Sequence, residues 1–202
     1  QSGQYDVAED LAKTITHAFP RYQFGWKLLG ALYQHNGRLE ESLVANETAV
    51  AIWPNDSEAN NNLGITLQAL GRMNDAEESF KKAIWMKPDF SEAYFNLGIT
   101  LQTLFRHGEA AENYKKAIAY NPDRAEAYFN LGITLQTLGK PEEAEQSFKK
   151  AIVIQPQHLK AHLNLGITIQ SLGRFVEAEE IFNKAIVIKP DDAETHYNLG
   201  NT

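Results

Sequence analysis

The sequence FNLGITLQTL at Phe95–Leu104 recurs letter for letter 34 residues later, at Phe129–Leu138. Related copies lie in the same register on either side, NLGITLQ at 62–68 and NLGITIQ at 164–170. A second block, FKKAI at 80–84, returns at the same spacing as YKKAI, FKKAI and FNKAI. A period between 20 and 50 residues is typical of repeat architectures, so this spacing decides the architecture before local propensity is considered.

The period divides the 202-residue chain into five full repeats. They span 23–56, 57–90, 91–124, 125–158 and 159–192; a partial repeat at 1–22 precedes them, and a truncated one at 193–202 follows. We expect all of them to form a single domain. Because the chain begins with Gln1 and ends partway through a repeat, we also expect it to be a piece of a longer protein.

Each repeat contains two segments in which apolar residues follow helical spacing, at steps of three and four. Gly71, Gly139 and Gly173 lie between the two segments, where a positive backbone angle favours glycine. A proline near the end of each repeat closes the second segment, because proline cannot continue a helix. These prolines are Pro54, Pro88, Pro122, Pro156 and Pro190. The sequence therefore predicts an all-α fold built from helix pairs.

Small residues recur at two fixed positions in the repeats, with large residues between them. They are Gly64, Gly98, Gly132 and Gly166 in the first helices and Ala76, Ala110, Ala144 and Ala178 in the second. This 34-residue pattern resembles the tetratricopeptide repeat family, and the resemblance covers nearly the whole chain. It implies a right-handed superhelical solenoid of antiparallel helix pairs, in which the first helix of each pair lines a concave face that binds partners.

Two repeats depart from the pattern. The first full repeat has Ser42 and Asn46 where the others carry alanine and an aromatic residue, so we expect weaker packing there. In the third, Phe105 replaces the turn glycine and Gly108 follows three residues later. We expect that turn to be rebuilt or strained, because a non-glycine residue rarely adopts a positive backbone angle.

Several residues of the first helices share one helical face and form stripes along the stack. We expect them to be the peptide-binding residues. The polar stripes are Asn62, Asn96, Asn130, Asn164 and Asn198, and Gln68, Gln102, Gln136 and Gln170; the apolar ones are Ile65, Ile99, Ile133 and Ile167, with Phe95 and Phe129 beside them. The rim carries Glu58, Glu92, Glu126, Lys160 and Glu194.

A primary amide both donates and accepts, so an asparagine ladder suits the backbone of an extended peptide, whatever its side chains. The ladder is similar to the asparagine ladder in the repeat arm of O-linked N-acetylglucosamine transferases, which holds the backbone of a substrate protein. The resemblance implies the same role for these asparagines. An alternative interpretation is that duplication copied solvated polar residues. For the isoleucine and aromatic stripes, the alternative is partial burial between adjacent repeats.

Composition and motifs exclude several function classes. A net charge of −7 argues against nucleic-acid binding, and no apolar run is long enough to span a membrane. No cofactor, catalytic or metal motif is present: His158 and His162 lack a third ligand, and the lysine pairs lie four residues after glutamates that support the helix. Because the chain has no cysteine, which suits a reducing compartment, we expect a cytoplasmic protein. Because no catalytic motif is present, we expect that the chain is not itself an enzyme.

The leading hypothesis is a protein-interaction scaffold that binds an extended peptide or partner segment in the concave groove. The alternative is the substrate-recognition arm of a larger glycosyltransferase or sulfotransferase, because the sequences at 4–9 and 24–27 resemble repeat arms fused to such bacterial enzymes. The catalytic domain would then lie outside these residues. A third possibility is self-association through uncapped repeat ends.

Overall fold

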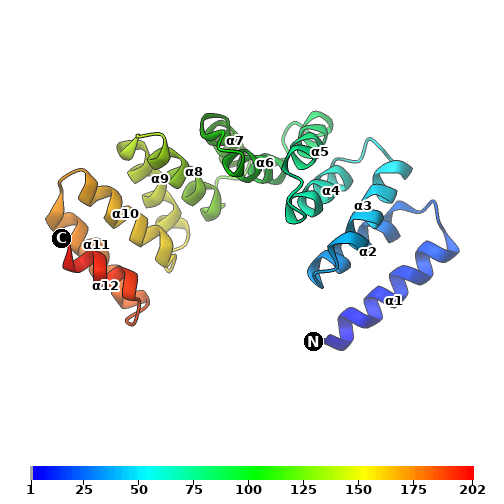
Figure 1. Cartoon of the computed structure of the whole chain (residues 1–202), viewed down its shortest axis with the longest axis horizontal. Coiled ribbons are helices and arrows are strands. Elements are labelled where there is room, and N and C mark those ends of the chain that lie inside the picture. Colours follow the sequence, from blue (N-terminus) through cyan, green and yellow to red (C-terminus); the bar gives the residue numbers. More distant parts are fainter. Residues whose placement is uncertain (1) are drawn as a thin grey trace. The chain divides into compact units, whose positions relative to one another are not determined.

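The computed structural model describes residues 2–202, with side chains from residue 7 onward, and this part of the chain forms twelve α-helices and no strand. Figure 1 shows the helices in chain order. Their bounds are α1 Ser2–Ala18, α2 Gln23–His35, α3 Leu39–Ile52, α4 Ser57–Ala69, α5 Met73–Met86, α6 Ser91–Thr103, α7 His107–Tyr120, α8 Ala125–Thr137, α9 Pro141–Ile154, α10 Leu159–Ser171, α11 Phe175–Ile188 and α12 Ala193–Gly200.

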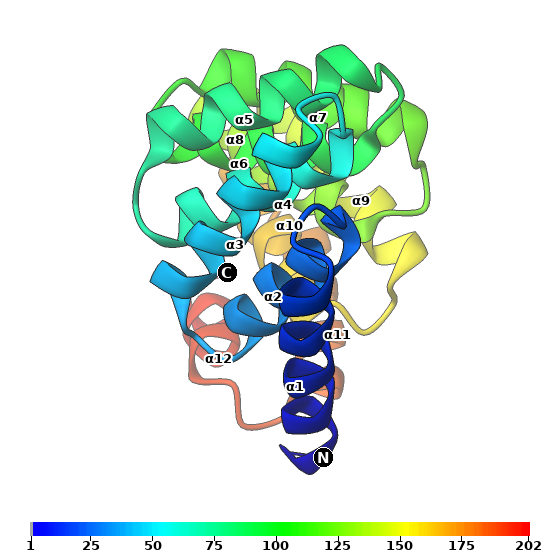
Figure 2. The same ribbon diagram turned by 90° about the vertical axis from the view of Figure 1, so that its right-hand side faces the viewer.

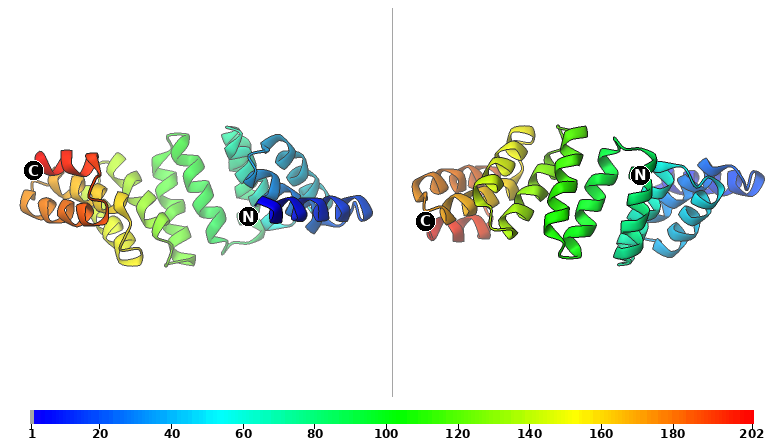
Figure 3. Two further views of the ribbon diagram at one scale, coloured as in Figure 1. Left: turned by 90° about the horizontal axis from the view of Figure 1, so that it is seen from below. Right: turned by 90° about the horizontal axis from the view of Figure 1, so that it is seen from above.

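The chain divides into two compact units, with the division between Leu104 and Phe105. The N-terminal unit contains α1–α6 and the C-terminal unit contains α7–α12. Within each unit, every helix packs against the next one along the chain, as Figures 2 and 3 show from other sides. The predicted all-α solenoid of helix pairs is confirmed, with two helices in each full repeat; the expectation of a single domain stays a prediction.

Helix ends follow the predicted punctuation. Gly71, Gly139 and Gly173 have φ of +76°, +69° and +76°, so each occupies the left-handed region between a first and a second helix. Pro141 is the first residue of α9, where its missing N–H removes no helical hydrogen bond. Each second helix ends two residues before its proline, as α5 does at Met86.

The two helices of a repeat approach closely where glycine faces an aromatic ring. A Cβ atom on Gly64, Gly132 or Gly166 would lie only 2.4–2.6 Å from the ring of Phe80, Phe148 or Phe182. Those rings are fully buried. Glycine therefore permits the close approach of the two helices in these three repeats.

In the first full repeat, polar groups take the place of the aromatic core. Ser42 and Asn46 are fully buried, and the Ser42 hydroxyl donates to Gly30 O at 2.8 Å. The Asn46 Nδ2 donates to Thr66 Oγ1 at 3.0 Å, while its Oδ1 has no hydrogen-bond partner in the described part of the chain. A hydrogen-bonded network thus replaces apolar packing; that the repeat is less stable stays a prediction.

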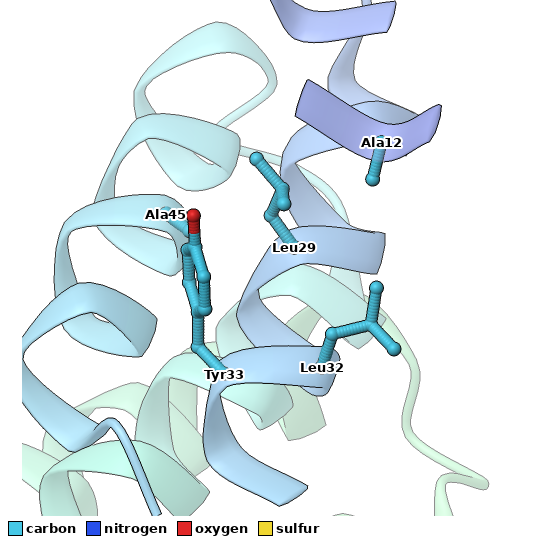
Figure 4. Packing of buried hydrophobic residues seen from close by; sticks show 5 residues of the cluster. All are labelled: Ala12, Leu29, Leu32, Tyr33 and Ala45. Atoms are coloured by element: carbon cyan, nitrogen blue, oxygen red, sulfur yellow. The ribbon is translucent and has the colours of Figure 1, made fainter. Parts of the chain in front are cut away.

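The helix before the first full repeat, α1, packs in the position of a second helix. It packs on α2, and Figure 4 shows Ala12 of α1 beside Leu29 and Leu32 of α2, with Ala45 of α3 beyond Tyr33. The buried Glu9 carboxylate binds Lys13 Nζ at 2.7 Å within α1. This helix therefore completes the core on one side of α2.

Candidate functional site

The first helices of the repeats line the inner face of each unit. In the N-terminal unit α2 contacts α4 and α4 contacts α6, and in the C-terminal unit α8 contacts α10. Among the described residues, the second helices α3 and α5, or α9 and α11, make no comparable contact. When the first helices of stacked pairs lie closer together than the second helices, the stack curves toward the first helices. The exposed side chains of the first helices then share a concave face.

The asparagines of the predicted ladder lie on this inner face, but their amides differ in environment. Asn62 and Asn130 are partly exposed, and among the described residues their side chains form no hydrogen bond. Asn96 is only 8% exposed and donates through Nδ2 to Asn61 Oδ1 at 3.1 Å. Identical residues at one repeat position therefore have different capacities for binding a ligand.

The two asparagines that follow are bonded within their own helices. Asn164 donates to Lys160 O at 2.8 Å, and Asn198 donates to Glu194 O at 2.9 Å. Both side chains remain partly exposed. Each amide therefore keeps an oxygen that can accept a further hydrogen bond.

The apolar stripes are divided between solvent and the repeat interfaces. The four isoleucines of the stripe, Ile65, Ile99, Ile133 and Ile167, are all partly exposed. Phe95 is buried, with 7% of its surface exposed. Phe129 is partly exposed, and its ring lies 4.7 Å from the His158 ring, centroid to centroid. Burial therefore accounts for part of these stripes, and the isoleucines leave apolar surface open to a ligand.

The glutamines connect successive repeats. Gln68 Nε2 donates to Thr100 Oγ1 at 3.2 Å, and Gln136 Nε2 donates to Thr168 Oγ1 at 2.7 Å. Gln170 Nε2 donates to Asn201 O at 2.9 Å. Gln102 is partly exposed. The bonded glutamines thus brace the stack, and their role in ligand binding stays a prediction.

Sequence reasoning missed the threonines that receive these bonds. Each buried threonine also donates to the backbone oxygen of the asparagine four residues earlier, as Thr100 does to Asn96 O at 3.0 Å and Thr168 to Asn164 O at 2.6 Å. The sequence does contain a pattern that could have identified these threonines, because threonine follows Gly-Ile in every copy of the motif. Four buried threonines share this bond to an asparagine backbone oxygen, Thr66, Thr100, Thr134 and Thr168, and of these Thr100 and Thr168 accept the glutamine bonds.

The rim residues of the inner face are exposed and mostly acidic. They are Glu58, Glu92, Glu126, Lys160 and Glu194. Glu58 binds Lys27 Nζ at 2.6 Å, and Lys27 also reaches Asp56, which caps α4 by accepting from the Ala59 N–H. The rim therefore adds negative charge to the inner face.

The lysine pairs of the second helices lie beside helix carboxylates, as their spacing predicts. Lys81 binds Glu77, and Lys149 binds Glu145, each at 2.6 Å. Arg174 of the next repeat also binds Glu145 at 2.7 Å. Hydrogen bonds from Arg174 and from Lys149 hold the pKa of Glu145 below its ordinary value, although burial of the carboxyl opposes them. These lysines are therefore engaged in the scaffold.

Of the two histidines, His158 caps a helix and His162 lies within it. His158 Nδ1 accepts from the Ala161 N–H at 3.2 Å at the start of α10, and burial lowers the pKa of His162. Among residues whose side chains are described, no three metal-ligating groups converge. In that same part of the chain, every helix is too short or too polar to cross a bilayer.

Comparisons with known proteins address the fold directly. Models of the tetratricopeptide repeat match residues 25–89, 125–158 and 159–192, and a TPR repeat model matches 106–139. The second and third of these matches coincide with the repeats that the sequence period defines. A search of curated proteins found no match.

Solved structures share the fold. MamA is 28% identical, with 82% of this chain and 97% of MamA covered and a TM-score of 0.76. PilW, described as a widely conserved type IV pilus biogenesis factor, is 24% identical over 98% of this chain and 92% of PilW, with a TM-score of 0.85. YrrB, described as a TPR protein with an unusual peptide-binding site, is 22% identical over 94% of this chain and 98% of YrrB, with a TM-score of 0.78.

The repeat period, the helix pairs and the glycine-to-aromatic packing agree with these matches, which together cover most of the sequence. The inner face of first helices carries the amides and isoleucines described above. The chain belongs to the tetratricopeptide repeat family.

Proposed function

We propose that the inner face of the first helices binds an extended segment of a partner protein. The observation that carries the proposal is the pair of equivalent amides on Asn62 of α4 and Asn130 of α8, which are partly exposed and form no hydrogen bond among the described residues. An amide can donate to a peptide C=O and accept from a peptide N–H. Each unit therefore offers one such amide to a ligand backbone.

Apolar surface beside each amide supports the proposal. Ile65 and Ile133 lie three residues after Asn62 and Asn130, on the same helical face, and both are partly exposed. Burial of apolar surface stabilises a complex by about 25 cal/mol per Å². A ligand would gain backbone hydrogen bonds from the amide and side-chain contact from the isoleucine, so binding would select weakly for sequence.

The role proposed is that of a scaffold without catalysis of its own. YrrB has the same fold, and its description shows that this fold can carry a peptide-binding site. The partner class is accordingly a protein or peptide.

The test is a peptide-array screen at moderate salt, with the wild-type chain beside the double variant Asn62→Ala/Asn130→Ala. We expect the variant to bind many unrelated peptides more weakly, by about fivefold for each net hydrogen bond lost, which corresponds to about 1 kcal/mol. Two controls accompany it: Asn96→Ala, whose amide already binds Asn61, and Lys81→Ala/Lys115→Ala on the second helices. Equal binding by wild type and the asparagine variant would refute the proposal.

A further inference from the structure

A second groove lies in the N-terminal unit, over α2 and between α1 and α3. Its floor is the row Trp26, Leu29 and Tyr33 on α2, and two open hollows flank that row. One hollow, of about 490 Å³, is walled by α1; the other, of about 320 Å³, is walled by α3. Because both share the same floor, they form one continuous surface, which we call the α1–α3 groove. Figure 4 shows Leu29 and Tyr33 on α2 together with Ala12 of α1 and Ala45 of α3.

The aromatic floor is held in place before any ligand arrives. The Trp26 indole N–H donates to Pro20 O at 2.9 Å, which satisfies its polar atom and leaves the ring faces apolar. The Arg38 guanidinium lies over the Tyr33 ring, 4.3 Å from its centroid. Val44, 61% exposed, extends the apolar surface along α3. A preorganised aromatic surface loses little entropy on binding.

The charges around the α1–α3 groove leave one carboxylate unpaired. Lys13 and Arg38 each bind Glu9 at 2.7 Å, and Arg38 also binds Glu41. Glu40 lines the groove, is exposed, and forms no ion pair with any described residue. The unpaired charge of this groove is therefore negative.

The equivalent groove of the C-terminal unit has the opposite charge. Its floor is Tyr128, Leu131 and Leu135 on α8, in a hollow of about 290 Å³. The lining residues Lys115 and Glu143 pair with Glu112 and Lys140, each at 3.2 Å. Lys150 also lines this hollow and has no ion-pair partner among the described residues. Two grooves of the same construction thus differ in the sign of the unpaired charge.

We propose that the α1–α3 groove is a second docking site, which takes a partner-protein segment that presents a bulky apolar side chain next to a lysine or arginine. The apolar side chain packs against the partly exposed Trp26 and the exposed Val44, above the buried Leu29 and Tyr33, and the basic group pairs with Glu40. Charge complementarity selects the basic segment and discriminates against an acidic one. The site uses none of the inner-face amides, so it acts independently of peptide binding there.

The first experiment measures fluorescence anisotropy with two labelled peptides, acetyl-Lys-Phe-Leu-Lys-amide and its glutamate counterpart, at low salt. We expect the lysine peptide to bind the wild-type chain more tightly than the glutamate peptide. Glu40→Lys should weaken binding of the lysine peptide by about threefold or more. Glu47→Lys makes the same change in net charge at an exposed position of α3 outside the groove lining, and should leave binding nearly unchanged. If Glu40→Lys and Glu47→Lys lowered the affinity for the lysine peptide equally, the proposal would be overturned.

The second experiment tests the apolar half of the site. Trp26→Leu should lower the affinity for the lysine peptide by about tenfold, as expected for an aromatic anchor. Tyr128→Leu in the C-terminal groove should leave that affinity unchanged. Thermal melting by circular dichroism establishes that both variants remain folded. Both experiments are run in the Asn62→Ala/Asn130→Ala background, which removes the inner-face amides and so separates binding in this groove from binding at the inner face. Unchanged binding by folded Trp26→Leu would refute the assignment.

Discussion

Phe105 occupies a backbone conformation that its side chain disfavours. It has φ of +58°, where the equivalent residues are Gly37, Gly71, Gly139 and Gly173, and its side chain is 84% exposed. The sequence predicted a rebuilt or strained turn at this point, and the structure confirms the strain. The exposed ring gains little from burial, and its aromatic contact is an edge-to-face one with the His107 ring, 6.2 Å between centroids.

Replacing the strained residue should stabilise the chain. The left-handed region costs a non-glycine residue about 1–2 kcal/mol, and glycine returns about 0.5–1 kcal/mol of this through its greater freedom in the unfolded state. Phe105→Gly should therefore raise the free energy of unfolding by about 0.5–1 kcal/mol, measured by urea denaturation. The control, Gly139→Ala, introduces a side chain at φ of +69° and should destabilise. A loss of stability in Phe105→Gly would contradict the strain argument.

His162 should make stability depend on pH near neutrality. Burial lowers its pKa, and nearby Lys184 and His158 act in the same direction, against a hydrogen bond with the His158 backbone. The unfolded chain therefore takes up a proton at higher pH than the folded chain, so stability falls as the pH drops below about 6.5. His162→Tyr, which installs the residue found at 94 and 128, should flatten the unfolding free energy between pH 7 and 5. An unchanged slope would show that other groups control it.

At the scale of the helices, the stack depends on two kinds of contact between neighbours. Glycine-to-aromatic packing joins the two helices of a repeat, as Gly132 does with Phe148. Glutamine-to-threonine bonds join the first helices of successive repeats, as Gln136 does with Thr168. The first contact sets how closely a pair packs, and the second links one pair to the next.

A methyl group at Gly132 should disrupt its helix pair. The added Cβ would lie 2.5 Å from Phe148 Cε1, so the ring or the helices must shift. Gly132→Ala should cost about 1–3 kcal/mol of stability, measured by urea denaturation. Phe148→Leu opens space at the same point, so the double variant should lose less than the two single variants together. Strict additivity would show that the two residues do not constrain each other.

The glutamine braces should contribute measurably to stability. Gln136→Ala removes a 2.7 Å hydrogen bond to a buried hydroxyl and should cost about 1 kcal/mol. Gln146→Ala, at an exposed position of α9, supplies the matched control and should change the free energy of unfolding little. Thermal and urea melts of the two variants would measure the difference. Equal stability of both variants would assign the glutamines a role outside the scaffold.

At the scale of the whole molecule, the first and last helices expose apolar residues that interior repeats would cover. Val7 and Leu11 of α1 are 68% and 58% exposed, and Tyr197 of α12 is 71% exposed. Repeat stacking buries such faces when another helix is present. We expect these exposed residues to form the contact surface if the chain self-associates through its end helices.

Self-association through these helices should depend on concentration. The weight-average mass from sedimentation equilibrium should rise with concentration for the wild-type chain and less for Val7→Lys/Leu11→Lys, because buried lysine is costly. Val153→Lys introduces the charge at a residue of α9 that is 75% exposed and should leave the association intact. A constant monomer mass for the wild type would rule out association of this kind.

The sequence by itself determined the repeat period, the two helices in each repeat, the turn glycines and the strain at Phe105. All of these depend on local chemistry: backbone angles, helical spacing and the size of a side chain. Pattern alone also places the stripe residues on a shared face of each first helix, because residues at steps of three and four lie together.

Only the tertiary structure decided how the polar stripes are used. Asn96 donates to Asn61 of the preceding repeat. The repeat before Asn164 has Phe129 at the position equivalent to Asn61, and Asn164 donates instead to the backbone of its own helix. Gln68 similarly reaches a threonine of the next repeat. The hydrogen bonding of an amide depends on which groups neighbouring helices bring within about 3 Å, and a repeated sequence gives identical residues different neighbours.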